Sequence, residues 1–346
     1  MKIETKELVS ALNFMAEIVP QNKLKPITEI VQISLSDNSV EFRMSNHINA
    51  VSVQLDCEND INDVICINFV NFHKLVKLFT KETTTIKVNS DNIEVRCNGK
   101  YKLPIELDEL GEKLTLGIDI CPSGKPVSVN LDGYAVYYKK LAVGLPNENV
   151  LPLYRVYTEG EVCVSTDTKV MVVLKEPLFD TEINPSTLRV MSLLRGDVSL
   201  YKTDKQYIID ADNILVSVPK VEEECFPAKV AMPLVKMINS DKSVSVSKSE
   251  IKAMLKRFDT VSSTTFDVKP IYLFADNGNL VIKDALDNIE EVICETDITN
   301  YRIKLPVDKF LKLINCLEEE MSLLLCSNDF LVLSDKYAYF ILGKVS

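Results

Sequence analysis

Few residues of this chain are of types that could carry out catalysis. There are only two histidines, His47 and His73, and they fall in different repeats of the pattern described below. All nine cysteines stand at least nine positions apart, which excludes CxxC zinc and redox motifs. The motifs GxxxxGK[ST], GxGxxG and GxSxG are absent, and no carboxylate pair stands out from the surface charge. The sequence therefore predicts no enzyme, no metal and no cofactor.

Basic side chains at helical spacing indicate a different chemistry. Two sets of lysines recur in this way: Lys74, Lys77 and Lys81, and Lys248, Lys252 and Lys256. Arg257 lies beside the second set, and further basic residues fall on or beside other expected helices: Lys23, Lys25, Lys139, Lys140, Arg189, Arg195, Lys309 and Lys312. Such side chains can contact nucleic-acid phosphates without reading sequence, and salt weakens these contacts. The alternative for each lysine is an ordinary solvated helix face.

The totals set limits on the class of protein. A chain of 346 residues with 46% hydrophobic residues fits roughly two or three packed domains. The net charge of −11 argues against coating nucleic acid by bulk charge, although it leaves room for a local basic surface. The start MKIETKELVS has no apolar signal region, and no apolar run is long enough for a membrane helix. We therefore expect reduced thiols, a cytoplasmic location and no membrane partner.

An internal repeat must position these residues. The stretch FHKLVKLF (72–79) is nearly rewritten as FLKLINCL (310–317), and both lie between strand-like segments. Phe72, Leu75, Val76 and Phe79 fall at the spacing of one apolar helix face. Each helix is followed by short alternating strands around a polar turn, which is the pattern of a hairpin. One βαβββ unit therefore occurs at least twice.

Four more copies of this unit can be found. The six hairpin tips are SDNS (36–39), SDNI (90–93), TEGE (158–161), TDKQ (203–206), DNGN (276–279) and SNDF (327–330). Long and short units alternate three times, which predicts an α+β fold of three tandem domains with two units each. The predicted domains are 1–117, 118–225 and 226–346.

This repeat order resembles the bacterial DNA polymerase III β subunit, the β sliding clamp. Four local segments also resemble that family: KIETKELVSALNFMAEIVP (2–20), PITEIVQISLSDNSVEF (26–42), VLPLYRVYTEGEVCVSTDTKVMVV (150–173) and FPAKVAMP (226–233). The resemblance covers essentially the whole chain. It implies a head-to-tail homodimeric ring, with helices lining the hole and sheets on the rim. Such a ring encircles duplex DNA and tethers DNA polymerase as a non-catalytic processivity factor, and a clamp-loader ATPase opens it.

The resemblance also implies a hydrophobic cleft between the second and third domains, where short motifs of polymerases and other partners dock. Its lining here would be Leu151, Thr166, Met171, Pro227, Val230, Phe340 and Leu342. The alternative is that these are plain core residues. After Thr166 and Asp167 the family commonly has Gly-His-Arg-Leu, and this chain has TKVM (168–171). The family's usual ending Met-Pro-Met-Arg-Leu is replaced by LGKVS (342–346), as in a divergent or mobile-element clamp with a changed peptide preference.

For the ring interface, the resemblance points to an edge strand at 100–105 that meets an edge near 261–266 of the other subunit. The residues expected there are Tyr101, Leu103, Ile105, Val261 and Phe266. Tyr101, Leu103 and Ile105 alternate, which fits one buried strand face. A competing interpretation is a clamp-shaped interaction scaffold that is never loaded on DNA, because a fold does not fix a function.

Overall fold

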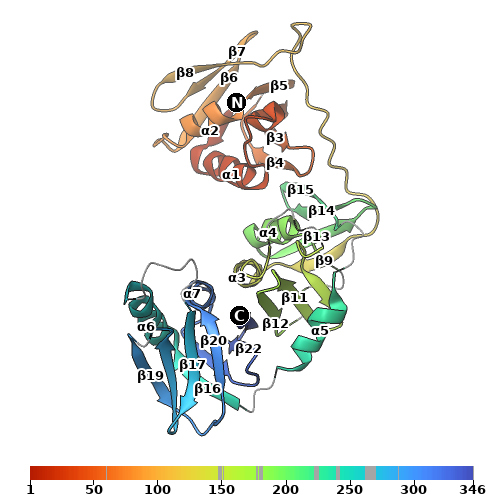
Figure 1. Ribbon diagram of the computed structural model, residues 1–346. Coiled ribbons are helices and arrows are strands. Elements are labelled where there is room, and N and C mark those ends of the chain that lie inside the picture. The colour runs from red at the N-terminus through yellow and green to blue at the C-terminus, as the bar shows by residue number, and fades with distance from the viewer. Residues whose placement is uncertain are drawn as a thin grey trace. The chain divides into compact units, whose positions relative to one another are not determined.

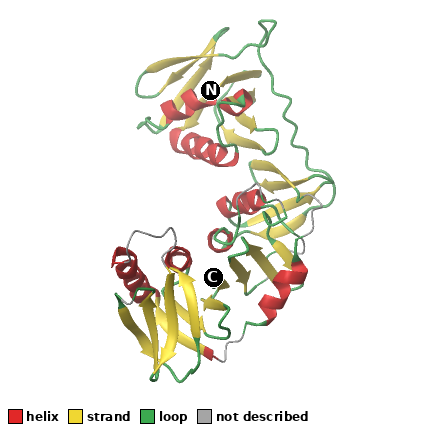
Figure 2. Cartoon of the chain, in the orientation of Figure 1, coloured by secondary structure: helices red, strands yellow, loops and turns green. Residues whose placement is uncertain are grey.

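The computed structural model describes residues 1–59, 61–146, 150, 152–176, 178, 182–221, 226–238, 242–261, 270–286 and 288–345. Helices and strands alternate along the chain in a mixed α+β fold (Figures 1 and 2). No helix in these ranges combines the length and the apolar character that a membrane span requires.

The first three βαβββ units are confirmed. The first comprises β1 (Lys2–Glu4), α1 (Thr5–Ile18), β2 (Ile30–Ser36), β3 (Ser39–Ser45) and β4 (Ala50–Asp56). The second comprises β5 (Asp63–Asn68), α2 (Phe69–Val76), β6 (Thr83–Val88), β7 (Asn92–Arg96) and β8 (Lys100–Pro104). The third comprises β9 (Val127–Asn130), α3 (Tyr134–Leu141), β10 (Tyr157–Glu159), β11 (Val162–Thr166) and β12 (Val170–Leu174).

The last three units have the same order of strands and helix. In the fourth, an isolated bridge at Ile183 replaces the first strand. It is followed by α4 (Pro185–Leu193), β13 (Asp197–Lys202), β14 (Gln206–Ala211) and β15 (Ile214–Pro219). After α5 (Ala228–Lys236), the fifth comprises β16 (Ser243–Ser247), α6 (Lys248–Val261), β17 (Pro270–Asp276), β18 (Asn279–Asp284) and β19 (Glu290–Glu295). The sixth comprises β20 (Arg302–Pro306), α7 (Val307–Cys316), β21 (Glu320–Leu324), β22 (Phe330–Ser334) and β23 (Ala338–Gly343).

The expected hairpin tips lie at turns between strands. Asn38 and Asn277 adopt left-handed backbone conformations there, with φ of 61° and 47°. Asparagine tolerates this region better than most residues, which is why Asn-containing tips mark hairpins in a sequence. The helix faces also agree with the periodicity, because Phe72, Phe310 and Ile314 are fully buried.

Two of the four sheets contain strands from two adjacent predicted domains. One has the strand order β5-β2-β3-β4-β15-β14-β13-β9, and the other has the order β10-β11-β12-β23-β22-β21-β16. The joining pairs are antiparallel: Val51 of β4 lies opposite Val216 of β15, and Val172 of β12 lies opposite Phe340 of β23. The remaining sheets, β1-β6-β7-β8 and β19-β18-β17-β20, end in β8 and β19. Within the described ranges, the outer edges of β8 and β19 pair with no further strand.

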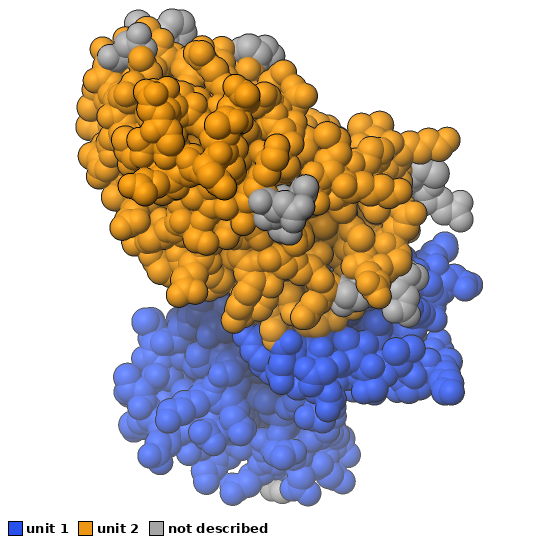
Figure 3. Space-filling view, turned by 90° about the horizontal axis from the view of Figure 1, so that it is seen from below, with its two compact units in different colours: residues 1–132, 189–220 blue, residues 133–188, 221–346 orange. Residues whose placement is uncertain are grey.

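The shared sheets divide the chain into two compact units (Figure 3). Unit 1 contains residues 1–132 and 189–220, and unit 2 contains 133–188 and 221–346. These units cut across the predicted boundaries after residues 117 and 225, because each joined sheet takes strands from both sides of a boundary. The three-domain division remains a prediction.

Candidate functional site

The basic residues on α2 follow the predicted stripe only in part. Lys74 and Lys77 are exposed at the end of this helix. The helix ends at Val76, so the placement of Lys81 on the same helical stripe is wrong. Asn98 accepts from the backbone N of Thr80 at 3.1 Å and donates to its hydroxyl at 2.6 Å. This side chain holds the residues after α2 in a turn, and the β-branched run that follows forms β6.

Lys140 is not a channel residue. Its side chain is 1% exposed, and its Nζ lies 2.5 Å from Oδ2 of Asp335, whose side chain is 0% exposed. The same Nζ donates to the carbonyl of Cys316 at 3.0 Å and to Glu318 at 3.2 Å. This network ties α3 to the end of α7 and to the β22–β23 turn. Its neighbour Lys139 is exposed, and nothing in the YYKK stretch shows which lysine points inward.

Other predicted basic residues are engaged with partners inside the chain. Arg189 pairs with Glu17 at 2.6 Å, and Lys309 pairs with Asp167 at 3.1 Å. Arg257 pairs with Glu291, and hydrogen bonding from the guanidinium lowers the pKa of that carboxyl. Lys248 donates to the carbonyl of Leu317 at 2.5 Å.

The basic residues that stay exposed form a smaller set. They are Lys23, Lys25, Lys74, Lys77, Lys81, Lys139, Arg195, Lys256 and Lys312, with Lys252 half-buried. None of these ten forms an ion pair within the described ranges. They are the side chains on which a phosphate contact could rest.

The predicted cleft residues divide between the two faces of one sheet. Met171 lies opposite Ile341, and both belong to a buried cluster with Phe226 and Ala231. Phe340 and Leu342 pair with the alternate residues of β12 and therefore point to the other face. Both are fully buried, and the ring of Phe340 lies 5.9 Å from Nζ of Lys140. Their assignment to an accessible cleft is wrong, because a strand offers only alternate side chains to one face.

The rest of the predicted cleft lies near the start of α5. Pro227 and Val230 are exposed and adjoin Phe226 and Ala231 of the buried cluster. Thr166 is buried and lies opposite Met171 in the sheet. Leu151 falls outside the described residues. The prediction missed Ile341 and Tyr157, whose ring stacks on Phe226 at 4.5 Å, although strand alternation alone could have indicated Ile341.

The turn before β12 explains one departure from the family pattern. Thr168 has φ of 75°, a left-handed conformation that glycine adopts readily and that a β-branched residue rarely adopts. Asp167 stabilises the turn, because its Oδ1 accepts from the backbone N of Lys169 and of Val170 at 2.9 Å and 2.7 Å. Threonine therefore occupies a position whose geometry favours the glycine of the family.

The predicted subunit edge is exposed at β8 but not beyond it. Tyr101 is partly exposed and packs on Phe79, with ring centroids 5.8 Å apart, and Leu103 is half-buried. Ile105 is buried and bridges Ile67, so its assignment to an interface is wrong. Val261 is exposed at the end of α6, and Phe266 lies outside the described residues. In unit 2, β19 is one of the strands that end a sheet, and sequence reasoning did not identify it.

No group of three or more potential metal ligands among His, Cys, Asp and Glu occurs in the described ranges. Each unit exposes lysines and has an open strand edge, at β8 in unit 1 and at β19 in unit 2, and the partly covered apolar cluster lies in unit 2.

Comparison with known proteins identifies the fold. No family model matches the chain, and no curated protein matches it by sequence. Among solved structures, the chain matches the DNA polymerase III β sliding clamp of Pseudomonas aeruginosa bound to griselimycin, with a TM-score of 0.82, 13% identity, and coverage of 100% of this chain and 99% of that one. A proposed DNA polymerase III β subunit from Eubacterium rectale matches with a TM-score of 0.78, 17% identity, and coverage of 99% and 98%.

A third structure is the Helicobacter pylori β clamp bound to a DNA ligase peptide, with a TM-score of 0.75, 14% identity, and coverage of 100% and 99%. The chain therefore has a DNA-clamp fold over its full length. Within that class, its fold is that of the bacterial DNA polymerase III β subunit.

Proposed function

We propose that this chain is a DNA polymerase processivity clamp. In this proposal two copies close head to tail around duplex DNA in the cytoplasm and tether DNA polymerase and other partners. The chain performs no chemistry, and a clamp loader opens the ring. The observation that carries the proposal is the match to sliding clamps along the whole chain, at TM-scores of 0.75 to 0.82.

The sheet topology supports closure by two copies. The last strand of one βαβββ unit joins the last strand of another at β4–β15 and again at β12–β23. The strands β8 and β19 are also the last strands of their units, and both have open outer edges in the described ranges. Pairing β8 of one copy with β19 of the other would repeat the same junction twice and leave neither edge open.

The charges of the two edges are complementary. Lys100 and Lys102 are exposed on β8, whereas Glu290 and Glu295 are exposed on β19. Opposite charges across a strand pair are favourable, and like charges are unfavourable. A β8–β19 contact between copies is therefore favoured over β8–β8 or β19–β19, which gives the ring its head-to-tail sense.

The solution mass tests closure first. Light scattering across a dilution series should give twice the 39.0 kDa mass of the chain. A mass of one chain at every concentration would contradict the closed ring.

Retention on DNA tests the channel. With the cognate loader, wild type should stay on nicked circular DNA and slide off after linearisation. Lys74→Glu with Lys77→Glu should shorten retention on the circle, because two exposed phosphate contacts become repulsive. Lys139→Glu should have a smaller effect of the same sign. Unchanged retention of the double variant would remove α2 from the channel.

Partner motifs are proposed to dock on the cluster around Met171, Phe226 and Ile341 near the exposed residues Pro227 and Val230. The P. aeruginosa and H. pylori clamps bind griselimycin and a DNA ligase peptide respectively. Large apolar anchors entering such a cluster would supply most of the affinity. Val230→Glu should therefore weaken binding of a hydrophobic motif peptide, which fluorescence anisotropy would measure.

A scaffold that is not loaded on DNA is the second candidate. The burial of Lys140 and the ion pairs of Arg189, Arg257 and Lys309 favour it, because they reduce the cationic surface. Partner binding without any retention on circular DNA would support this candidate.

A further inference from the structure

Part of the coil that connects β8 to β9 in unit 1 crosses a sheet face as an extended segment (Figure 1). This segment, residues 113–120 with the sequence KLTLGIDI, is called the strap here. Leu114 and Leu116 are half-buried, Ile118 and Ile120 are buried, and the residues between them are exposed. Such alternation is typical of an extended chain with one side against a surface.

The strap covers the joined sheet of unit 1. Ile118 and Ile120 pack on side chains of β4, β13, β14 and β15, and so span the β4–β15 junction. The sheet residues of this cluster are Ile208, which is buried, and Ala50, Tyr201 and Leu215, which are half-buried. They lie on the face opposite to that of Val51 and Val216, which are fully buried.

Two side chains of the sheet hold the backbone of the strap. Oε1 of Gln32 accepts from the backbone N of Leu116 at 2.8 Å, and Nη1 of Arg43 donates to the carbonyl of Ile118 at 3.2 Å. Within the described ranges, no backbone–backbone hydrogen bond joins residues 115–120 to a strand. Because both anchors contact main-chain atoms, another extended segment could use them equally well.

Glycines with left-handed backbones lie on both sides of the strap. Gly111 has φ of 80° and Gly124 has φ of 88°. A side chain at either position would meet no neighbouring atom, so the requirement for glycine is conformational and does not come from packing. Backbone rotation at two such residues can move the segment between them away from the sheet as a unit.

The corresponding linker of unit 2 is built differently. There, α5 covers the outer face of the other joined sheet, and Ala231 and Leu234 pack on the cluster around Met171. As a helix, α5 makes its own backbone hydrogen bonds, such as that from the N of Ala231 to the carbonyl of Pro227. The strap lacks such a ladder, so it would lose few hydrogen bonds on leaving its sheet.

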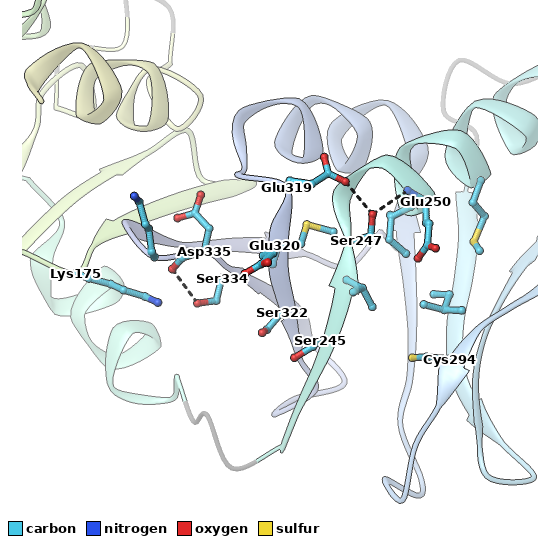
Figure 4. Close-up of a pocket in the computed structure, with 16 residues that line it drawn as sticks. Lys175, Ser245, Ser247, Glu250, Cys294, Glu319, Glu320, Ser322, Ser334 and Asp335 are labelled. Atoms are coloured by element: carbon cyan, nitrogen blue, oxygen red, sulfur yellow. Dashed lines mark hydrogen bonds between the residues drawn. The ribbon is translucent and has the colours of Figure 1, made fainter.

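A second sheet face, in unit 2, is open but polar. A groove of about 660 Å³ lies beside β16, and its floor contains Ser245, Ser322 and Ser334 on three neighbouring strands (Figure 4). A serine floor offers an apolar segment little hydrophobic gain, whereas the face under the strap carries Ile208 and Leu215. Of these two faces, the one under the strap suits an apolar extended segment.

We propose that the strap is releasable and that the sheet face beneath it is a docking site for a partner protein. The occupant is an extended partner segment with leucine or isoleucine at alternate positions. Its side chains replace those of Ile118 and Ile120, and its backbone bonds to Gln32 and Arg43. The seated strap selects this occupant, because it shows which kind of segment fits. The inference goes beyond the processivity function and does not require ring closure.

A labelled peptide with the sequence of residues 113–120 tests the proposal on the full chain. Wild type should bind this probe weakly, because its own tethered strap competes at a high effective concentration. Ile118→Asp with Ile120→Asp releases the strap and should tighten binding at least tenfold, as measured by fluorescence anisotropy. A probe with serine in place of both isoleucines should not bind, because it lacks the apolar side chains.

Matched variants locate the site. Thr115→Asp with Gly117→Asp adds the same two charges on the exposed side of the strap and should bind the probe as weakly as wild type. In the released variant, adding Leu215→Ser should weaken binding, because it removes part of the apolar floor. Adding Val230→Glu, in the partner cluster of unit 2, should leave binding unchanged. Circular dichroism checks that each variant is folded.

Hydrogen exchange tests release in wild type. The amide of Leu116 is bonded to the strap anchor Gln32, and the amide of Gln54 is bonded to the carbonyl of Asn213 across the β4–β15 junction. If the strap opens by itself, the amide of Leu116 should exchange at least tenfold faster than that of Gln54. Equal rates would show that the strap leaves only when the junction unfolds, which overturns the proposal.

Three binding results would also overturn the proposal. The first is equal binding of the probe by wild type and by the released variant. The second is tight binding by the variant with aspartates at 115 and 117, and the third is loss of binding on adding Val230→Glu, which would place the probe in unit 2. A doubled solution mass of the released variant that the probe reverses would assign the site to a second copy of this chain instead.

Discussion

Some strand edges in this chain are paired within a sheet, and others are free. At the joined edges of β12 and β23, Val172 and Phe340 lie opposite each other and are fully buried. At the free edges, Lys102 of β8 and Glu290 of β19 are exposed. Backbone hydrogen bonds are similar at both kinds of edge. The side chains therefore determine whether an edge is paired within the folded chain or stays free.

The difference teaches how one repeat can serve both folding and assembly. Apolar pairs at a joined edge are removed from water on folding and hold the sheet together. Charged residues at a free edge keep it soluble and discourage pairing with unrelated strands. In the proposed ring, the opposite charges of β8 and β19 favour pairing of each edge with the other edge of a second copy.

The largest expected effect is on the free energy of unfolding, when a side chain at a joined edge is truncated to alanine and compared with one at a free edge. Phe340→Ala should lower the free energy of unfolding by about 3–5 kcal/mol, because it leaves a cavity in a buried junction. Val292→Ala truncates an exposed side chain of β19 and should change the free energy of unfolding by less than about 0.5 kcal/mol. Urea denaturation followed by circular dichroism measures both. Similar losses for the two variants would show that β19 is already covered in the isolated chain.

The ion pair behind the joined edge should have the next largest effect. Asp335→Ala leaves the buried Lys140 ammonium with only the half-exposed carboxylate of Glu318 and should cost about 3 kcal/mol of unfolding free energy. Replacing the pair together, as Lys140→Met with Asp335→Leu, should recover much of this loss, because no charge then remains buried. Glu94→Ala on β7, which breaks the ion pairs with Arg96 and with Lys100 of β8, is the comparison beside a free edge. A double variant less stable than Asp335→Ala would contradict this account.

The repeat itself could be predicted from the sequence because its signals are local. Apolar spacing gave the helix at 310–317, and polar turn residues such as Asn38 gave the hairpins. Local patterns do not say which of two adjacent residues faces inward. Lys139 and Lys140 differ by one position, yet one is exposed and the other is 1% exposed.

The site was harder to predict than the fold for the same reason. Matching segments to the family assigned Phe340 and Leu342 to the cleft, but a strand sends alternate residues to opposite faces. Ile341 is the residue that joins Met171. The sequence did not predict that β19 is an edge strand. A strand is at an edge when no other strand pairs with one of its sides, and local sequence patterns do not show which strands pair.

Reversing one charge on the free edge β19 tests whether that edge pairs with a second copy. Glu290→Lys on β19 should weaken the proposed dimer roughly three- to tenfold, because in that dimer β19 would pair with the edge that carries Lys100 and Lys102. Adding Lys102→Glu to the same chain should restore part of the loss. Sedimentation equilibrium gives the dissociation constants, and Glu7→Lys, an exposed change away from both edges, is the charge-matched control. If Glu290→Lys and Glu7→Lys behave alike, β19 is not the subunit edge.

The smallest expected effect concerns the turn that leads into the joined edge. Thr168 holds a left-handed conformation that costs an L-amino acid about 1 kcal/mol or more. Thr168→Gly should therefore raise the free energy of unfolding by roughly 0.5–1 kcal/mol, after the greater entropy of unfolded glycine is taken into account. Thr203→Gly, in the β13–β14 turn where the backbone is not left-handed, should instead lower it. Denaturation midpoints measure both changes. A loss of stability in Thr168→Gly would mean that the hydrogen bonds of Asp167, and not the residue at 168, set the energy of this turn, and that the joined edge carries no strain for glycine to relieve.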